Sequence, residues 1–229
     1  ECINGYHDDG KYYLTNVKQE IAYYRTKANH ILSKAYPLME IYTEKSKDRF
    51  YDFLANEAQK EGKYSDLYAS LPLYTISDEL FQNILKRNHV AEEKQQMLLH
   101  DLHRIRDNFL QMLQSNSVED RIPLLSQEEY VKTPLTLSLS ETFYEREIYC
   151  TYDEYLEHYH QTVGFTKSYP NYTAFPQHTR IFRNIQIQMK HNKWVAVSKN
   201  KSPVIHFVIR HPKMREAMAD GLWPVMTRL

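Results

Sequence analysis

Apolar residues recur at helical spacing in four stretches of the first half of the chain. The stretches cover residues 17–34, 48–60, 77–85 and 91–114. Thr15 or Asn16 is placed to cap the first stretch, and Gly62 follows the second as a natural stop. Ser77 stands where the third needs an N-cap. The pattern predicts a helical region over residues 1–114.

The longest of these stretches carries an apolar stripe whose residues alternate in steps of four and three. They are Leu98, Leu102, Ile105 and Phe109. This is the a/d spacing of a short coiled-coil seam. Two interpretations remain open: the stripe is the buried side of a helix in a bundle core, or it is a seam between two subunits. In the second case we expect a homodimer that forms through this helix.

The hydrophobic pattern weakens between residues 115 and 150, where Pro123, Pro134 and a run rich in Ser and Thr at 133–140 interrupt it. Proline and short polar residues are typical of loops and boundaries. Alternating leucines within the run are compatible with a short strand or with an extended connector. We therefore predict that residues 115–150 connect two domains.

After residue 150 the spacing changes from helical to alternating. Thr151 and Glu154 have the spacing of a capping box, which predicts the start of a helix. Three segments with a strand pattern follow, at residues 181–190, 194–198 and 204–210. A helix closes the chain. We predict that residues 151–229 form a small, mostly antiparallel sheet of three or four strands with flanking helices, which places the whole chain in the α+β class.

Charge and composition narrow the possible partners. The chain has 29 basic and 29 acidic side chains, interspersed along its length. No basic face large enough to bind a phosphate backbone is indicated, so we expect no specific DNA binding by these residues. No apolar run approaches the roughly 18 residues that a membrane span needs. We expect a cytoplasmic protein that does not contact a membrane.

Cys2 and Cys150 are too few for a disulfide framework and have no metal-ligand spacing, so we expect reduced thiols. The polar stretch at residues 4–10 resembles a linker, and we expect a further domain before it. No motif in the chain indicates a cofactor.

Four segments resemble the carboxyl-terminal region of Xre/Cro-like helix-turn-helix transcription regulators of Gram-positive bacteria. They are residues 35–43 (AYPLMEIYT), 70–75 (SLPLYT), 195–199 (VAVSK) and 207–214 (FVIRHPKM). The resemblance implies a region that dimerises and senses a small-molecule or peptide effector, while DNA is bound by a domain absent from this chain. It implies no enzyme activity, and it supplies no ligand-binding residues to transfer.

One local motif points to a different function. His191 and Lys193 are followed by Ser198, a spacing similar to half of the phospholipase D signature. In that signature an Asp stands where this chain has Ser198, and two copies of the motif converge on one phosphoryl group. No second copy is found here. The alternatives are a phosphodiesterase-like hydrolase that uses His191 and Lys193, a degenerate phosphate-binding site, or a polar hairpin turn.

His206 and Arg210 share one face of a predicted strand, because they are four residues apart at a period of two. On an open face of the sheet the two side chains would hold an anionic ligand, with Arg210 offering its bidentate fork. The alternative is a solvated face, or one that a helix covers and an ion pair satisfies.

Histidines and tyrosines give weaker signals. His100 and His103, and separately Glu154, His158 and His160, have spacings compatible with metal ligation, but no third ligand or supporting shell can be named. We expect surface histidines and no metal. The 19 tyrosines, many of them in the first third of the chain, suit an interface or ligand pocket, or equally the rim of a helical core.

Overall fold

The computed structural model describes residues 3–6, 12–35, 38–178 and 182–227. The chain folds as two compact units that divide after residue 37. Each unit is described here by itself. Because helices pack on a mixed sheet in which most neighbouring strands are antiparallel, the predicted α+β class is confirmed.

The first unit is a hairpin followed by a helix. Its elements are β1 (Ile3–Tyr6), β2 (Tyr12–Thr15) and α1 (Lys18–Leu32), with the two strands antiparallel. The Thr15 hydroxyl accepts a hydrogen bond from the Val17 amide at 3.2 Å and donates one to Glu20 at 2.6 Å. These bonds fix the turn into the helix. The predicted helix over residues 17–34 is confirmed. The expected linker at residues 4–10 needs correction, because residues 4–6 belong to β1 of the hairpin, while residues 7–10 lie outside the described residues.

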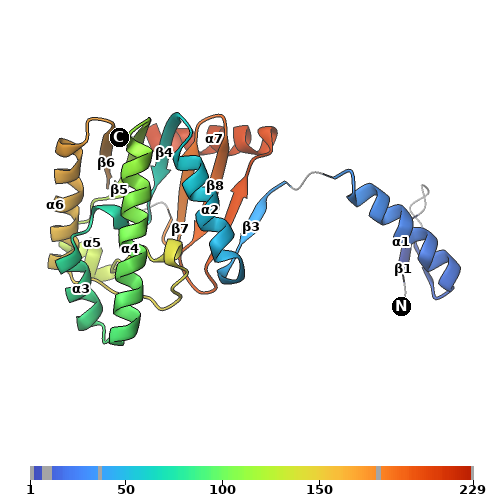
Figure 1. The fold of residues 1–229 in the computed structure, drawn as a ribbon, viewed down its shortest axis with the longest axis horizontal. Helices are drawn as coiled ribbons and strands as arrows, with labels where there is room; N and C mark the ends of the chain where they lie inside the picture. Colours follow the sequence, from blue (N-terminus) through green and yellow to red (C-terminus); the bar gives the residue numbers. More distant parts are fainter. Residues whose placement is uncertain (1–2, 7–11, 36–37, 179–181, 228–229) are drawn as a thin grey trace. The chain divides into compact units, whose positions relative to one another are not determined.

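The second unit is built on a mixed sheet that has seven strands within the described residues. In spatial order they are β3 (Glu40–Tyr42), β9 (Ile205–Ile209), β8 (Trp194–Lys199), β7 (Ile185–Lys190), β4 (Gly62–Leu67), β5 (Asn116–Pro123) and β6 (Tyr172–Gln177). Strands β4, β5 and β6 run parallel, and the other neighbouring pairs are antiparallel. The parallel and antiparallel halves of the sheet therefore meet at β4 (Figure 1).

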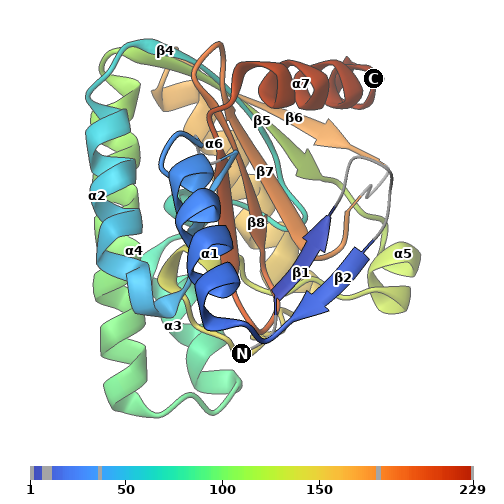
Figure 2. The same ribbon diagram turned by 90° about the vertical axis from the view of Figure 1, so that its right-hand side faces the viewer.

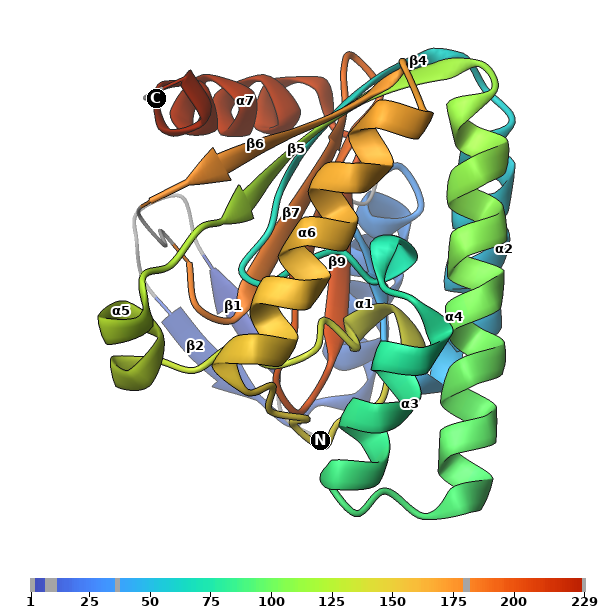
Figure 3. The same cartoon turned by 90° about the vertical axis from the view of Figure 1, so that its left-hand side faces the viewer.

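Helices cover both faces of this sheet. They are α2 (Lys47–Ala58), α3 (Asp78–Arg87), α4 (Glu92–Leu113), α5 (Gln127–Lys132), α6 (Tyr152–Ser168) and α7 (Pro212–Thr227). Short 3-10 helices are η1 (Glu44–Ser46), η2 (Leu73–Thr75) and η3 (Ser140–Thr142). Figures 2 and 3 show α2, α4 and α6 on one side of the sheet and α7 on the other.

Two apolar cores follow from this layering. The larger one joins α2, α4 and α6 to the sheet and contains side chains such as Phe50, Leu102 and Tyr155. The smaller one lies between the opposite face and α7, where Met189 and Leu222 are buried. Because the larger core holds most of the buried side chains, it contributes most of the hydrophobic stabilisation.

Crossover connections explain why α4 and α6 lie on the same face. Strand β4 is joined to β5 through α3 and α4, and β5 is joined to β6 through α5 and α6. Parallel neighbours need such crossovers, which are almost always right-handed. Since the strand order advances in one direction from β4 to β6, the successive crossovers place their helices on one face.

Several predicted element boundaries are confirmed. Ser77 caps α3 by accepting a hydrogen bond from the Leu80 amide at 3.2 Å. Thr151 and Glu154 form the reciprocal hydrogen bonds of a capping box at the start of α6. The three predicted strands correspond to β7, β8 and β9, although β7 begins at Ile185 and Ile181 lies outside the described residues. The sheet is larger than the predicted three or four strands, because β3, β4, β5 and β6 join it.

The predicted division into a helical region at 1–114, a connector at 115–150 and a separate domain at 151–229 needs correction. Residues 38–229 form one compact unit. Strand β5 lies inside the expected connector and pairs with β4 from the expected helical region. The alternating leucines of the connector are buried in the larger core without forming a strand. The prolines and hydroxyl residues that suggested a boundary lie in a segment that the core anchors.

The apolar stripe of α4 is part of the larger core. The exposed fractions are 0% for Leu98 and Leu102, 7% for Ile105 and 6% for Phe109. Elements of the same unit cover these side chains, among them α2, α3 and η2. Of the two interpretations the bundle core therefore holds, and the stripe is not free to form a seam with a second subunit.

We expect Leu102→Ala to lower the free energy of unfolding by about 2–5 kcal/mol, as other truncations of fully buried leucines do. Urea denaturation followed by circular dichroism measures this loss. Val131→Ala is the control, because that side chain is 72% exposed, and it should change stability little. A Leu102→Ala variant of unchanged stability and weakened self-association would instead support the seam.

Candidate ligand-binding cleft

Polar side chains form rows on the face of the sheet that α2 and α4 cover. Asp66 on β4 is in register with Asp120 on β5 and with Gln188 on β7. A second row pairs Gln186 with Ser198. Sheet faces beneath helices are ordinarily apolar, and buried polar groups need a specific reason to be there. These rows therefore mark a candidate functional surface.

Asp66 and Asp120 form a pair of buried carboxyl groups with exposed fractions of 2% and 0%. The Met189 amide donates to Asp66 at 3.2 Å. The hydroxyls of Tyr74 and Tyr172 donate to Asp120, the latter at 2.8 Å. Burial and the neighbouring Asp120 charge raise the pKa of Asp66 well above its ordinary value. Burial raises the pKa of Asp120 to about 7, against the lowering effect of the tyrosine hydrogen bonds. The pair therefore retains a proton near neutral pH.

A third carboxyl group, Glu141, comes from η3. Burial raises its pKa to about 7, although the charge of Arg104 and a side-chain hydrogen bond oppose this. The helix ends at Phe143, whose φ of 58° lies in the left-handed region that bulky residues rarely adopt. Such a backbone costs about 1–3 kcal/mol. The Phe143 ring packs edge-on against Phe50 with centroids 5.7 Å apart. This packing holds the strained turn and thereby fixes Glu141 over the sheet.

Asp66 and Glu141 line a cleft between α2, α4 and the sheet. The cavity has a volume of about 60 Å³, which is room for a few water molecules. Its lining residues are Leu54, Glu57, Ala58, Tyr64, Asp66, Tyr74, Ile105, Asn108, Phe109, Met112, Glu141, Gln188 and Trp194. The Gln188 Oε1 atom is buried and has no hydrogen-bond partner among the described residues. Aromatic and apolar walls with a few converging polar groups are typical of small-molecule sites.

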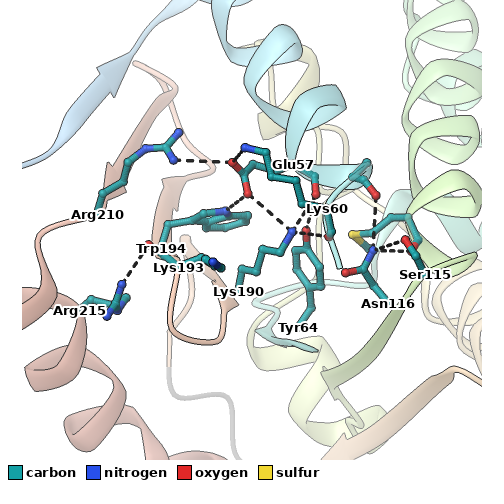
Figure 4. Close-up of polar contacts among 12 residues, drawn as sticks. Glu57, Lys60, Tyr64, Ser115, Asn116, Lys190, Lys193, Trp194, Arg210 and Arg215 are labelled. Carbon is teal, nitrogen blue, oxygen red and sulfur yellow. Dashed lines mark hydrogen bonds and ion pairs between the residues drawn. The ribbon is translucent and has the colours of Figure 1, made fainter. Parts of the chain in front are cut away.

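Glu57, in the last turn of α2, lines the cleft, and Figure 4 shows its polar contacts. Its carboxylate accepts hydrogen bonds from Trp194 Nε1 at 3.0 Å and from Lys60 Nζ at 2.7 Å. Burial alone would raise its pKa, but these bonds and the nearby positive charges hold the pKa below its ordinary value. Glu57 is therefore ionised, whereas the pKa values of Asp66, Asp120 and Glu141 are raised.

The ammonium group of Lys190 lies beneath the same helix end and has an exposed fraction of 0%. It donates to the Glu57 carbonyl at 2.8 Å and to the Lys60 carbonyl at 2.7 Å, and it lies 3.6 Å from the Glu57 carboxylate (Figure 4). A cation is favourable at a helix C-terminus, where carbonyl groups lack partners. Burial lowers the pKa of Lys190, and the Glu57 charge opposes this. Gly62 leaves the space that the lysine chain occupies.

The His191, Lys193 and Ser198 motif does not assemble into one site. His191 Nε2 lies 2.8 Å from Ser65 Oγ, on the side of the sheet that α7 covers. Ser198 Oγ lies 2.8 Å from His206 Nδ1, on the side that α2 covers. Lys193 is in the turn between β7 and β8. Ser198, which stands where the signature has an Asp, is thus on the opposite face of the sheet from His191. This arrangement agrees with the alternative of a polar hairpin turn.

The expectation that His206 lies on an open face was wrong, because α2 and η3 cover it. The side chain is 0% exposed and stacks on Phe50 with centroids 4.0 Å apart. Its Nε2 atom lies 3.0 Å from the carbonyl oxygen of Ser140. Burial lowers the pKa of His206 to about 4, so the ring is neutral at physiological pH and offers an anion no charge.

Arg210 is half exposed, and its partners differ from those of His206. It donates to Glu40 at 2.8 Å, and it lies 3.6 Å from the Glu57 carboxylate. Two carboxylates thus already hold the guanidinium group, and an anionic ligand would have to compete with them. This arrangement corresponds to the satisfied ion pair, the alternative to an anion site.

The histidines of the helices also differ from expectation in one respect. His158 is 3% exposed, not a surface residue, and its Nε2 atom lies 3.1 Å from the Pro72 carbonyl oxygen and 3.2 Å from Thr75 Oγ1. His103 pairs with Asp78 at 2.7 Å. Within the described part of the chain, no group of three or more His, Cys, Asp and Glu is placed to hold a metal ion.

The carboxyl groups and amide of the cleft were not predicted from the sequence. Asp66 and Asp120 occupy strands with few apolar residues on the same face, so the alternation that identifies a half-buried strand is absent. The available signal was weak: each segment of otherwise strand-like residues contains two adjacent polar residues, Ser65-Asp66 in the first and Glu119-Asp120 in the second. Glu141 and Gln188 had no sequence signal at all.

Comparison with known proteins gives no relative: no family model, no curated protein and no solved structure matches the chain. No helix among the described residues is both long and apolar enough to cross a membrane.

Gly62→Ala tests the space beneath α2. A Cβ atom there would lie 2.8 Å from Lys190 Cε, and the lysine is held by two carbonyl groups, so we expect a loss of about 1–3 kcal/mol in the free energy of unfolding. Gly164→Ala in α6 is the matched control, because nothing lies within 4 Å of its Cβ position. That variant should gain about 0.5–1 kcal/mol from helix propensity. Chemical denaturation of the two proteins measures the difference, and equal effects would contradict the close packing.

The buried carboxyl groups should make stability fall as pH rises. Asp120 and Glu141, with pKa values of about 7 in the folded chain, bind more protons there than in the unfolded chain, so their contribution is complete at low pH and is lost through pH 7. His158 and His206, whose pKa values are lowered to about 4, act oppositely, and their effect fades as the pH rises above 6.5, the ordinary histidine pKa. From pH 6.5 to 8 we therefore expect a decrease on the order of 1 kcal/mol.

Glu141→Gln should make that decrease shallower. Glu119→Gln is its control, since the Glu119 pKa is already lowered by Lys63 in spite of burial. Urea denaturation at a series of pH values gives the slopes. Identical slopes for the wild type and Glu141→Gln would show that Glu141 does not hold a proton in this range.

Proposed function

We propose that this chain is the effector-sensing region of a cytoplasmic bacterial transcription regulator and that the cleft between α2, α4 and the sheet is its effector site. The observation that carries the proposal is the combination of aromatic walls and buried, converging polar groups in one cavity. The resemblance to Xre/Cro-like regulators supports the regulatory role. In this proposal DNA is bound by another domain, in keeping with the balance of 29 basic and 29 acidic side chains.

A hydrolase of phosphate esters receives less support. A phosphodiesterase site needs its nucleophile, its orienting group and its phosphate-binding cation around one phosphoryl group. His191 and Ser198 contact different faces of the sheet, and the cleft itself is lined by carboxyl groups, which repel phosphate. A binding function requires only that the cleft recognise its ligand.

The test is a thermal-shift screen of metabolites and short peptides against the purified chain. Binding to the native state alone raises the melting temperature by mass action. Asn108→Trp, at the partly buried wall of the cleft on α4, should abolish the shifts. Gln111→Trp is the matched control, because it places the same ring at an exposed position one turn further along α4 and outside the lining. Shifts that persist in Asn108→Trp would place the effector site elsewhere.

The same preparation tests the alternative function. Hydrolysis of a chromogenic phosphodiester above background, lost in His191→Ala, would contradict the sensing role and favour the hydrolase. We expect equal, negligible rates for the two proteins.

A further inference from the structure

The carboxyl groups of the cleft lack a counterion. No ion pair reaches Asp66, Asp120 or Glu141 from any residue that the structure describes. The cations whose charge acts on these groups have carboxylate partners elsewhere: Arg104, near Glu141, pairs with Asp101 at 2.8 Å, and Arg121, next to Asp120, pairs with Glu119 at 3.5 Å. A buried carboxyl group without a counterion either keeps its proton or receives a cation from outside.

A second feature of the cleft also calls for a hydrogen-bond donor. The Gln188 Oε1 atom is buried, lies in the lining and has no partner among the described residues. An orphaned acceptor of this kind is unfavourable, because it has given up its hydrogen bonds to water without replacement. A ligand that donates several N–H bonds would satisfy this amide oxygen and the neighbouring Asp66 carboxylate together.

The walls add an aromatic component. Tyr64, Tyr74, Phe109 and Trp194 line the cavity, and the Tyr74 and Phe109 rings are stacked with centroids 3.5 Å apart. Aromatic faces attract cations, and organic cations more readily than strongly hydrated metal ions. Carboxylates, an amide oxygen and aromatic faces are the groups that bind an ammonium or guanidinium head.

We propose that the effector presents a small organic cation, an ammonium or guanidinium group, which enters the cleft between the Asp66 and Glu141 carboxylates and displaces a proton from them. This inference rests on the proposed function, since it names the ligand class of the same site. The N–H groups of the cation donate to the two carboxylates and to Gln188 Oε1. Its charge takes the place of the proton, which is released to solvent.

The surroundings determine which protons move. Other charged groups around the two carboxylates are Asp120 on β5, Glu57 on α2 and Arg104 on α4, with Arg121 next to Asp120. Glu57 is ionised and paired, and the two cations keep their partners. Burial raises the pKa of the surrounding tyrosines, Tyr68, Tyr74 and Tyr172 among them, so they do not titrate near neutral pH. The displaced proton therefore comes from Asp66 or Glu141.

Two isosteric pairs of probes test the charge requirement. We expect butylammonium and butylguanidinium to bind, with butan-1-ol and butylurea at least about tenfold weaker, because hydrogen bonds to charged groups contribute more than neutral ones. Affinity for butylammonium should rise by up to about tenfold per unit of pH between pH 6 and 8, in proportion to the protons released. Isothermal titration calorimetry in buffers of different ionisation enthalpy counts those protons.

Variants assign the effect to the cleft. Asp66→Asn should weaken butylammonium binding at least about tenfold, whereas Glu119→Gln, which removes a carboxylate outside the lining, should leave it unchanged. If Asp66→Asn fails to fold, Glu141→Gln and the probe pairs on the wild-type chain give the same comparison. Neutral probes that bind as tightly as the cations, or no binding of either cation at millimolar concentration, would overturn the inference.

The two proposals fail in different ways. Neutral or anionic compounds whose binding is lost in Asn108→Trp would exclude a cationic effector and leave the cleft as the effector site. Binding of any class that survives in Asn108→Trp would exclude the cleft itself.

Discussion

The buried contact between Lys190 and the last turn of α2 is the interaction on which the arrangement of this unit depends. A single ammonium group joins β7 to the carbonyl groups of a helix end, and the adjacent Glu57 extends the contact to β8 through Trp194 and to Arg210, which directly follows β9. Removing one partner of such a buried pair is costly, because the remaining charge is left without compensation. The helix is therefore fixed over the sheet by charge as well as by apolar packing, and the position of α2 defines one wall of the cleft.

The sequence predicted the helices and the antiparallel strands well, because those elements carry their own periodic signal. The helix that carries the stripe from Leu98 to Phe109 buries one apolar side, and β7 and β8 show the alternating pattern of strands. Strands β4 and β5 could not be found in this way. Their helix-covered face holds Tyr64 and Asp66 beside Val118 and Asp120, so polar and apolar residues alternate along the same face instead of between faces. Local pattern cannot reveal a strand whose burial is decided by hydrogen-bond partners distant in the sequence.

The candidate site was missed for the same reason. Sequence spacing directs attention to His191, Lys193, His206 and Arg210, which lie close together along the chain. In the folded unit they have separate surroundings, and the groups that converge come from β4, η3 and β7. Asp66 and Glu141 are 75 positions apart in the numbering, and only the register of the sheet and the left-handed turn at Phe143 bring them to one cavity. Spacing identifies sites built within one element, whereas this cleft is built between elements.

The position of β4 also constrains how the chain reaches its folded state during synthesis. The strand is made early, yet its antiparallel neighbour β7 follows it by more than a hundred residues, so the centre of the sheet closes only when the carboxyl-terminal strands emerge. Pairings of such long range are slow to form. Until then β4 and β5 expose an unpaired edge, which is a template for association with other chains. A ribosome-bound chain ending near residue 180 should therefore depend on chaperones more than one that extends past β9.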